Sequence, residues 1–350
     1  MGPSTAIIEA PMRTLPVAGK SRRANEPDGL AVRLTERVVG QPDAVSQIVP
    51  YVEMFQAGLA PEARPAGVFL LLGPTGTGKT RTVEALAEVL HGSQRNVLRV
   101  DCGEFQMEHE VAKLVGAPPG YLGHRETQPM LTHNKLISVA SETCGLSLVL
   151  FDEIEKAAPS MTRLLLGVLD KAVLRLGDNT QVNFERTMIF MTSNLGASEM
   201  RREIAPDFGF ASIMPAGRRG LHKKLENIGM GAVRRRFSPE FVNRIDAMIT
   251  YQPLGRDALR RIVDQQIEIL EQHIESRLME RAFALKVEAP AREFLLEKGT
   301  SDEYGARELK RTILRQLTQP LAAMVAAGAV EPGAVVRVTV KGDRLMLTIE

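Results

Sequence analysis

The residues best suited to chemistry form the run Gly73-Pro74-Thr75-Gly76-Thr77-Gly78-Lys79-Thr80. This run matches the pattern G-x-x-x-x-G-K-[ST] and directly follows the apolar segment 68–72, which favours a buried strand, a tight turn and then a helix. Glycines allow successive backbone N–H groups to face phosphate oxygens, and a helix from Lys79 to about Val89 would point its positive end at them. We therefore predict a nucleoside triphosphate site made by Pro74, Thr75, Gly76, Thr77, Gly78, Lys79 and Thr80. In it Lys79 contacts the β- and γ-phosphates and the Thr80 hydroxyl binds Mg²⁺.

Two later apolar segments end in polar residues that could complete this site. Asp152 and Glu153 follow the segment 146–151, and Asn194 follows the segment 187–192. Asp152 can hold Mg²⁺ with Thr80, Glu153 can polarise the attacking water, and Asn194 can hold that water against the γ-phosphate. Taken singly, the acidic pair could merely begin a helix and Asn194 could cap a turn. Their combination with the phosphate loop favours the catalytic roles.

These side chains meet only if a sheet brings the ends of their strands together. From Leu34 to about Tyr251, short apolar runs alternate with helical patterns, which predicts a parallel sheet with crossover helices. The expected strands are near-continuous apolar runs, as in sheets covered on both faces, and they span 68–72, 96–100, 146–151, 187–192 and 247–251.

The composition changes after Pro253-Leu254-Gly255. Apolar residues then recur at helical spacing over 259–278, and two shorter helices are expected over 291–298 and 306–316. Alternating residues over 335–340 and 345–349 predict a closing hairpin. The fold class is therefore α/β, with a parallel P-loop sheet followed by a small α+β lid. The expected divisions are a flexible arm over 1–29, a large domain over 30–253 and the lid over 254–350.

Composition limits the classes of partner. The chain has 350 residues, 44% hydrophobic and 25% charged, which is typical of a soluble globular protein with two domains. A net charge of +2 gives no electrostatic attraction to nucleic acid or membrane. No apolar run reaches the roughly 18 residues of a membrane helix, and the N-terminus lacks an apolar signal core, so we expect a cytoplasmic protein. Cys102 and Cys144 match no disulfide or zinc spacing.

The motifs taken together resemble those of the Clp-type AAA+ ATPases, a family of protein unfoldases and disaggregases, and above all the second ATPase module of the members with two rings. The resemblance covers roughly residues 30–345. It rests on seven strings that occur in the family's order: RVVGQ (37–41), GPTGTGKT (73–80), VGAPPGYLG (115–123), LFDEIEKA (150–157), MTSNLGA (191–197), FSPEFVNRID (237–246) and YGARELKR (304–311).

The resemblance implies ATP as the nucleotide and assigns further residues. Val38, Val39 and Gly40 match the segment whose backbone lies against the adenine. Arg244 matches the arginine finger that reaches the γ-phosphate bound by the neighbouring subunit, and Arg307 matches the lid residue that senses nucleotide within its own subunit. The resemblance also implies a homo-oligomer, a ring of six subunits.

Two loops are assigned by the same resemblance. Gly120-Tyr121-Leu122-Gly123 is similar to the pore loop that grips an unfolded or tagged polypeptide, since an aromatic ring can hold varied side chains. The alternative is a buried tyrosine in a Pro/Gly turn. Phe208-Gly209-Phe210 lies where peptidase-partnered relatives carry a docking tripeptide, although its first residue is aromatic rather than aliphatic. It would dock a Clp peptidase or simply anchor its own loop.

We therefore expect an ATP-hydrolysing motor that threads polypeptide through a ring and could feed a peptidase. One alternative is an AAA+ remodeller of nucleic acid or of a dedicated assembly, which the near-neutral charge and Tyr121 disfavour. The other is a non-catalytic, nucleotide-gated scaffold, which Glu153 and Arg244 disfavour.

Overall fold

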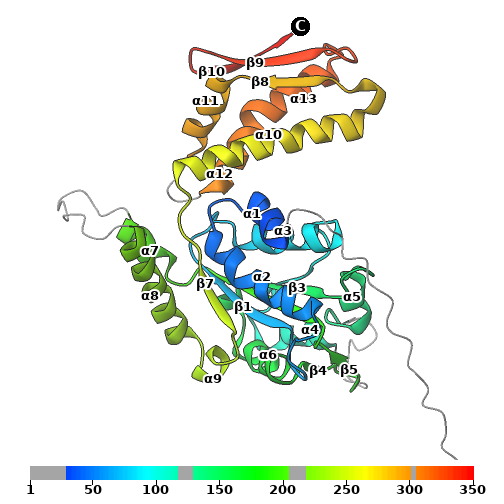
Figure 1. Cartoon of the computed structure of the whole chain (residues 1–350), viewed down its shortest axis with the longest axis vertical. Helices are drawn as coiled ribbons and strands as arrows, with labels where there is room; N and C mark the ends of the chain where they lie inside the picture. The colour runs from blue at the N-terminus through cyan, green and yellow to red at the C-terminus, as the bar shows by residue number, and fades with distance from the viewer. Residues whose placement is uncertain (1–28, 117–128, 205–217, 301–304) are drawn as a thin grey trace, which may run out of the picture.

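The computed structural model describes residues 29–116, 129–204, 218–300 and 305–350. Figure 1 shows an α/β body that carries the first two thirds of the chain, with a smaller unit of helices and strands stacked on one end of it. Residues 251–255, which have no regular structure, connect the two parts. In the described part of the chain, none of the helices has both the length and the apolar character that crossing a membrane requires.

A five-stranded parallel sheet forms the centre of the body, with the strand order β2-β3-β6-β1-β7. Its strands are β1 (Gly67–Leu72), β2 (Leu98–Asp101), β3 (Ser147–Asp152), β6 (Thr187–Ser193) and β7 (Ala247–Thr250). Leu72 pairs with Ser193, and Asp101 pairs with Asp152. This register places the carboxyl ends of the strands along one edge, where the predicted site residues follow.

Helices cover both faces of this sheet, which explains why every residue of β1 is buried. One face packs against α1 (Leu30–Arg37), α2 (Pro42–Gln56) and α3 (Lys79–His91). The other packs against α4 (Val111–Val115), α5 (His133–Ser138), α6 (Pro159–Lys171), α8 (Arg218–Arg236) and α9 (Pro239–Val242). Successive residues of β1 alternate between these two cores, since Phe69 belongs to the first and Leu70 to the second.

The smaller unit has a hydrophobic core of its own. It contains α10 (Arg256–Leu278), α11 (Ala289–Gly299), α12 (Ala306–Ile313) and α13 (Gln319–Ala326), with the strand order β10-β9-β8. Strand β8 (Ala284–Val287) runs parallel to β9 (Val335–Lys341), and β10 (Arg344–Ile349) runs antiparallel to it. The predicted fold class, a parallel P-loop sheet followed by an α+β lid, is confirmed.

Several elements differ from the sequence-based expectation. The helix expected to end at residue 316 continues through a π-helical segment, Leu314–Thr318, into α13. The pattern also missed β8, the short hairpin of β4 (Val173–Arg175) and β5 (Gln181–Asn183), and α7 (Ala197–Ile204). These strands have only three or four residues, too few for alternation to identify them.

Candidate functional site

The phosphate loop joins β1 to α3 through three glycines with positive φ. The φ angles are 141° at Gly73, 81° at Gly76 and 102° at Gly78. A Cβ atom on Gly73 would lie 2.7 Å from the carbonyl oxygen of Tyr251, so only glycine permits this close approach. A Cβ atom on Gly78 would meet nothing within 4 Å. The loop is therefore held against the protein at its start and leaves space where phosphate oxygens would lie.

Lys79 is buried at the start of α3, and its ammonium group is fully engaged. Its Nζ atom donates to Gly73 O at 2.7 Å, to Pro74 O at 2.9 Å and to Asn194 Oδ1 at 2.9 Å. The residue is 8% exposed, and this burial lowers the pKa of Lys79 to about 8. A desolvated ammonium beside an open glycine loop is well suited to bind an anionic oxygen, so the loop fits a nucleotide phosphate.

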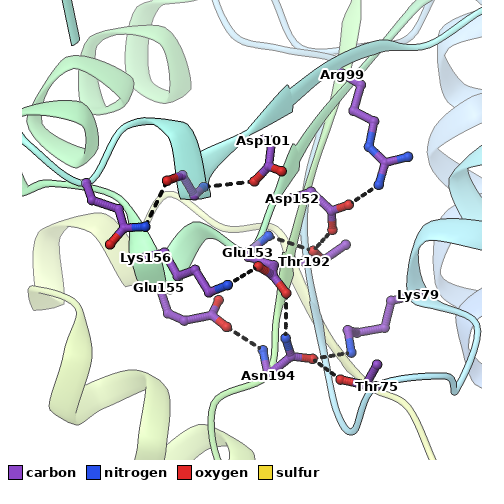
Figure 2. Close-up of polar contacts among 12 residues, drawn as sticks. Thr75, Lys79, Arg99, Asp101, Asp152, Glu153, Glu155, Lys156, Thr192 and Asn194 are labelled. Carbon is purple, nitrogen blue, oxygen red and sulfur yellow. Dashed lines mark hydrogen bonds and ion pairs between the residues drawn. The ribbon is translucent and has the colours of Figure 1, made fainter. Parts of the chain in front are cut away.

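Asn194 connects the phosphate loop to the acidic end of β3 (Figure 2). Its Oδ1 accepts from Lys79, and its Nδ2 donates to Glu153 Oε1 at 3.3 Å. Glu155 Oε1 accepts from the Asn194 backbone N–H at 3.0 Å and so holds the residue in place. The structure thus brings Lys79, Glu153 and Asn194 together in one hydrogen-bonded group.

Glu153 lies immediately after β3 with a φ of 57°, a left-handed conformation that is uncommon for a residue with a side chain. Its backbone N–H donates to Thr192 Oγ1 at 3.0 Å, and its Oε2 forms an ion pair with Lys156 Nζ at 2.5 Å. The turn directs the carboxylate toward Asn194. This geometry suits a base that acts on a water molecule held beside the phosphate loop.

Both carboxylate oxygens of Asp152 have protein partners. Thr192 Oγ1 donates to Oδ1, and Arg99 Nη2 donates to Oδ2. Thr80 occupies the first turn of α3, after Lys79. A hydroxyl and a carboxylate are the oxygen ligands that suit Mg²⁺, which also uses substrate phosphates and water. Across the described ranges, no group of three or more His, Cys, Asp and Glu residues could hold a metal by itself. The role of Thr80 and Asp152 as Mg²⁺ ligands stays a prediction that rests on the chemistry of their oxygens.

The segment assigned to the adenine packs between the sheet and the start of α10. Val38 and Val39 are buried, and Gly40 has a φ of 79°, where a Cβ atom would lie 2.9 Å from Leu254 Cδ2. Gln41 was not among the predicted site residues, although it belongs to the same motif. Its Nε2 donates to Thr77 O at 3.0 Å and to Gln252 O at 2.8 Å, so it ties the phosphate loop to the connection between the two parts.

The start of α12 lies directly on the phosphate loop. The Ala306 backbone N–H donates to Gly76 O at 3.2 Å. A Cβ atom on Gly305 would lie 3.0 Å from the same oxygen. Burial is the main cause of the lowered pKa of Lys79, and the positive charge of Arg307 adds to it. The backbone beside Arg307 therefore contacts the phosphate loop, and the role of Arg307 itself stays a prediction.

Arg244 lies near the amino ends of the strands, whereas the phosphate loop lies at their carboxyl ends. It precedes β7, which runs parallel to β1 with Phe69 opposite Ala247, whereas the loop follows the far end of β1. Figure 1 shows α9, just before Arg244, at the bottom of the body, whereas α12 of the smaller unit lies above the top of the body. Arg244 Nε forms an ion pair with Asp170 Oδ1 at 3.2 Å. The structure does not bring Arg244 to the site of its own chain.

The two remaining predicted groups, Gly120-Tyr121-Leu122-Gly123 and Phe208-Gly209-Phe210, lie outside the described residues. Sequence reasoning also missed Arg99, Thr192 and Glu155. Glu155 and Thr192 lie inside two of the seven strings, whereas Arg99 lies in none of them. The partners of all three lie 39 to 53 residues away in the sequence.

Two family models match the two parts of the chain. A family model described as "AAA domain (Cdc48 subfamily)" matches residues 64–248. A second, described as "C-terminal, D2-small domain, of ClpB protein", matches residues 254–338.

Similar relatives include the proteins named Chaperone protein ClpB from Pseudomonas putida, 38% identical, and from Mesorhizobium japonicum, 40% identical. Each alignment covers 89% of this chain, and 34% and 33% of the respective relatives. The chain thus spans about a third of the length of the curated relatives that it matches. A solved structure, "Closed State CryoEM Reconstruction of Hsp104:ATPyS and FITC casein", superposes with a TM-score of 0.74 at 30% identity. The superposition covers 90% of this chain and 50% of the chain in the solved structure.

Proposed function

Because the chain belongs to the AAA domain family, Cdc48 subfamily, we propose that it binds and hydrolyses ATP and uses the energy to unfold polypeptides. The observation that carries the proposal is the group formed by Lys79, Asn194 and Glu153. In this group the amide of Asn194 hydrogen-bonds to a cation suited to phosphate on one side and to a base on the other.

The roles of the site residues follow from their contacts. Lys79 steadies the β- and γ-phosphates, together with the backbone N–H groups of the glycine loop. Asn194 orients the attacking water, and Glu153 takes its proton. Thr80 and Asp152 would hold Mg²⁺, which offsets negative charge on the phosphates when it is bound. Val38, Val39 and Gly40 would line the adenine.

Hydrolysis also needs a cation beyond the γ-phosphate, and Arg244 is suited to supply it from a neighbour. Its place at the far edge of the sheet prevents action within its own chain but suits a subunit interface. An arginine supplied in this way contributes about a thousandfold or more to hydrolysis. The assembly that follows is a ring, six-membered by the resemblance, in which each site is completed by the next subunit.

The polypeptide substrate is proposed from the relatives and from the sequence. The curated relatives are named chaperones, and the solved neighbour's description includes casein. Tyr121, which lies between Gly120 and Gly123 in the sequence, would contact the polypeptide in the ring's channel. Peptidase docking through Phe208-Gly209-Phe210 stays a separate prediction, since the relatives' names mention no peptidase. A pull-down with a Clp peptidase tests it, with Phe210→Ala as the control.

The test is ATP-dependent unfolding of a tagged, folded fluorescent reporter, with particle imaging of the assembly in parallel. We expect unfolding and ring-shaped particles with ATP, and neither ATP turnover nor unfolding by Lys79→Ala. Tyr121→Ala should hydrolyse ATP but leave the reporter folded. ATPase activity that responds to DNA and not to unfolded protein would instead indicate a nucleic-acid remodeller. ATP binding without turnover would indicate a scaffold.

A further inference from the structure

Asp152, the carboxylate suited to Mg²⁺, is paired with a cation of its own chain (Figure 2). Its Oδ1 accepts from the Thr192 hydroxyl, whose oxygen also accepts from the Glu153 backbone N–H at 3.0 Å. Its Oδ2 accepts from Arg99 Nη2. The two contacts have different consequences. A neutral hydroxyl can remain on one oxygen while a metal binds the other, whereas a guanidinium and a dication repel each other at the same oxygen.

Arg99 is placed so that it can leave Asp152. It lies on β2, the edge strand of the sheet, and its side chain is 53% exposed, against 15% for that of Asp152. On its other side, Nη1 lies 4.0 Å from Oε1 of Glu84 on α3. A second carboxylate is therefore available to the guanidinium after a small movement, and an exposed edge position leaves room for that movement.

Lys79, the buried cation of the site, does not share this contact. An ammonium group has three donors. In Lys79 they donate to Gly73 O, Pro74 O and Asn194 Oδ1. Lys79 is thus committed to the phosphate loop. Within the described ranges, the cation that donates to Asp152 is Arg99.

We propose that Arg99 competes with the divalent cation for Asp152, and that Glu84 receives the guanidinium when the metal binds. The inference rests on the proposed Mg²⁺–nucleotide site. Arg99 is a positioning residue: it keeps Asp152 paired and oriented while no metal is present, and it weakens metal binding until nucleotide phosphates add their own oxygens. The Thr192 hydroxyl holds the carboxylate in place during the exchange.

The experiment measures how much Mg²⁺ is needed to tighten the binding of a fluorescent ADP analogue, without any turnover. The parent chain and the variants Arg99→Gln, Glu84→Gln and Arg95→Gln are first freed of metal with a chelator, and Mg²⁺ is then titrated into each. Arg95 is an exposed arginine just before β2 and serves as the matched control. We expect Arg99→Gln to need about fivefold less Mg²⁺, as removal of an exposed ion pair implies. Glu84→Gln should need more, and Arg95→Gln should match the parent.

An unchanged or larger Mg²⁺ requirement in Arg99→Gln would overturn the competition. It would show that Arg99 only orients Asp152 or contacts the nucleotide. An unchanged requirement in Glu84→Gln would overturn the transfer, and this variant decides alone if Arg99→Gln does not fold. A parent chain that binds the analogue without any effect of Mg²⁺ would instead count against the proposed function. The two failures are therefore distinguishable.

Discussion

Replacing Gly305 by alanine should separate the lid from the phosphate loop without unfolding either part. Gly305 has a φ of 49° and a ψ of −136°, a conformation that residues with a side chain rarely adopt. Forcing alanine into it costs on the order of 1–3 kcal/mol. The new Cβ would also lie 3.0 Å from Gly76 O and 3.3 Å from Gly76 C, where both neighbours are backbone atoms that cannot rotate away.

The strain energy of alanine at position 305 exceeds the free energy of the hydrogen bond that holds the lid against the phosphate loop. The Ala306 N–H to Gly76 O hydrogen bond contributes about 0.5–1.5 kcal/mol, so retreat of α12 is the cheaper response. The lid keeps its own hydrophobic core, so it should stay folded as it retreats. If Arg307 contacts the nucleotide as predicted, that contact is then lost. A hydrogen bond to a charged group contributes about 1.5–3 kcal/mol, which corresponds to a loss of affinity of roughly 10- to 150-fold.

The assay is equilibrium binding of a fluorescent ATP analogue to the parent chain, Gly305→Ala, Arg307→Ala and the double variant. We expect each single variant to bind more weakly and the double variant to add little, because both remove the same contact. Gly328→Ala is the control: Gly328 lies in the lid with a φ of 69°, but a Cβ there would meet nothing within 4 Å. Full additivity in the double variant, or equal losses in Gly328→Ala, would refute the reasoning.

Three further predictions concern Lys79, Asn194 and Arg244. The lowered pKa of Lys79, about 8, means that the free site loses its proton above pH 8. Phosphate favours the charged form of Lys79, so nucleotide binding above pH 8 should take up protons, and the affinity should fall as pH rises. Calorimetry in two buffers of different ionisation enthalpy measures the proton uptake. Binding heats that do not depend on the buffer would contradict this prediction. Asn194→Ala should lower ATP turnover about 10- to 100-fold and nucleotide affinity less, as steady-state kinetics would show; equal losses would deny its role in orienting water. Arg244→Ala should lower turnover about a thousandfold with binding intact, and mixing it with Glu153→Gln chains should restore part of the activity if the arginine acts between subunits.

The local parts of the fold were predictable because their signals are local. The glycine motif between an apolar run and a helical pattern predicted β1, the phosphate loop and α3, and the observed strand Gly67–Leu72 differs from the expected one by a single residue. Strands buried on both faces read as continuous apolar runs, so β3 and β6 were also found nearly at their observed bounds. Short strands such as β8 carry too few residues for such a pattern.

Contacts between distant segments could not be predicted in the same way. Gln41 and Gln252 lie 211 positions apart, yet their hydrogen bonds join the phosphate loop to the connection with the lid. Arg99 meets Asp152 because β2 and β3 pair in one particular register, and nothing in either strand's own sequence states that pairing. Such partners depend on which strands become neighbours.

The amino-acid sequence by itself determined the chemistry available to this protein: a glycine loop with Lys79 and Thr80, a strand ending in Asp152 and Glu153, and polar residues where later strands end. These are properties of residue type and near-neighbour spacing, which the backbone expresses locally. The tertiary structure alone decided how they meet. It placed Asn194 between Lys79 and Glu153, seated Gly305 against Gly76 and put Arg244 at the far edge of the sheet. Only strand pairing and the packing of the lid on the phosphate loop bring together segments that are so far apart in the sequence.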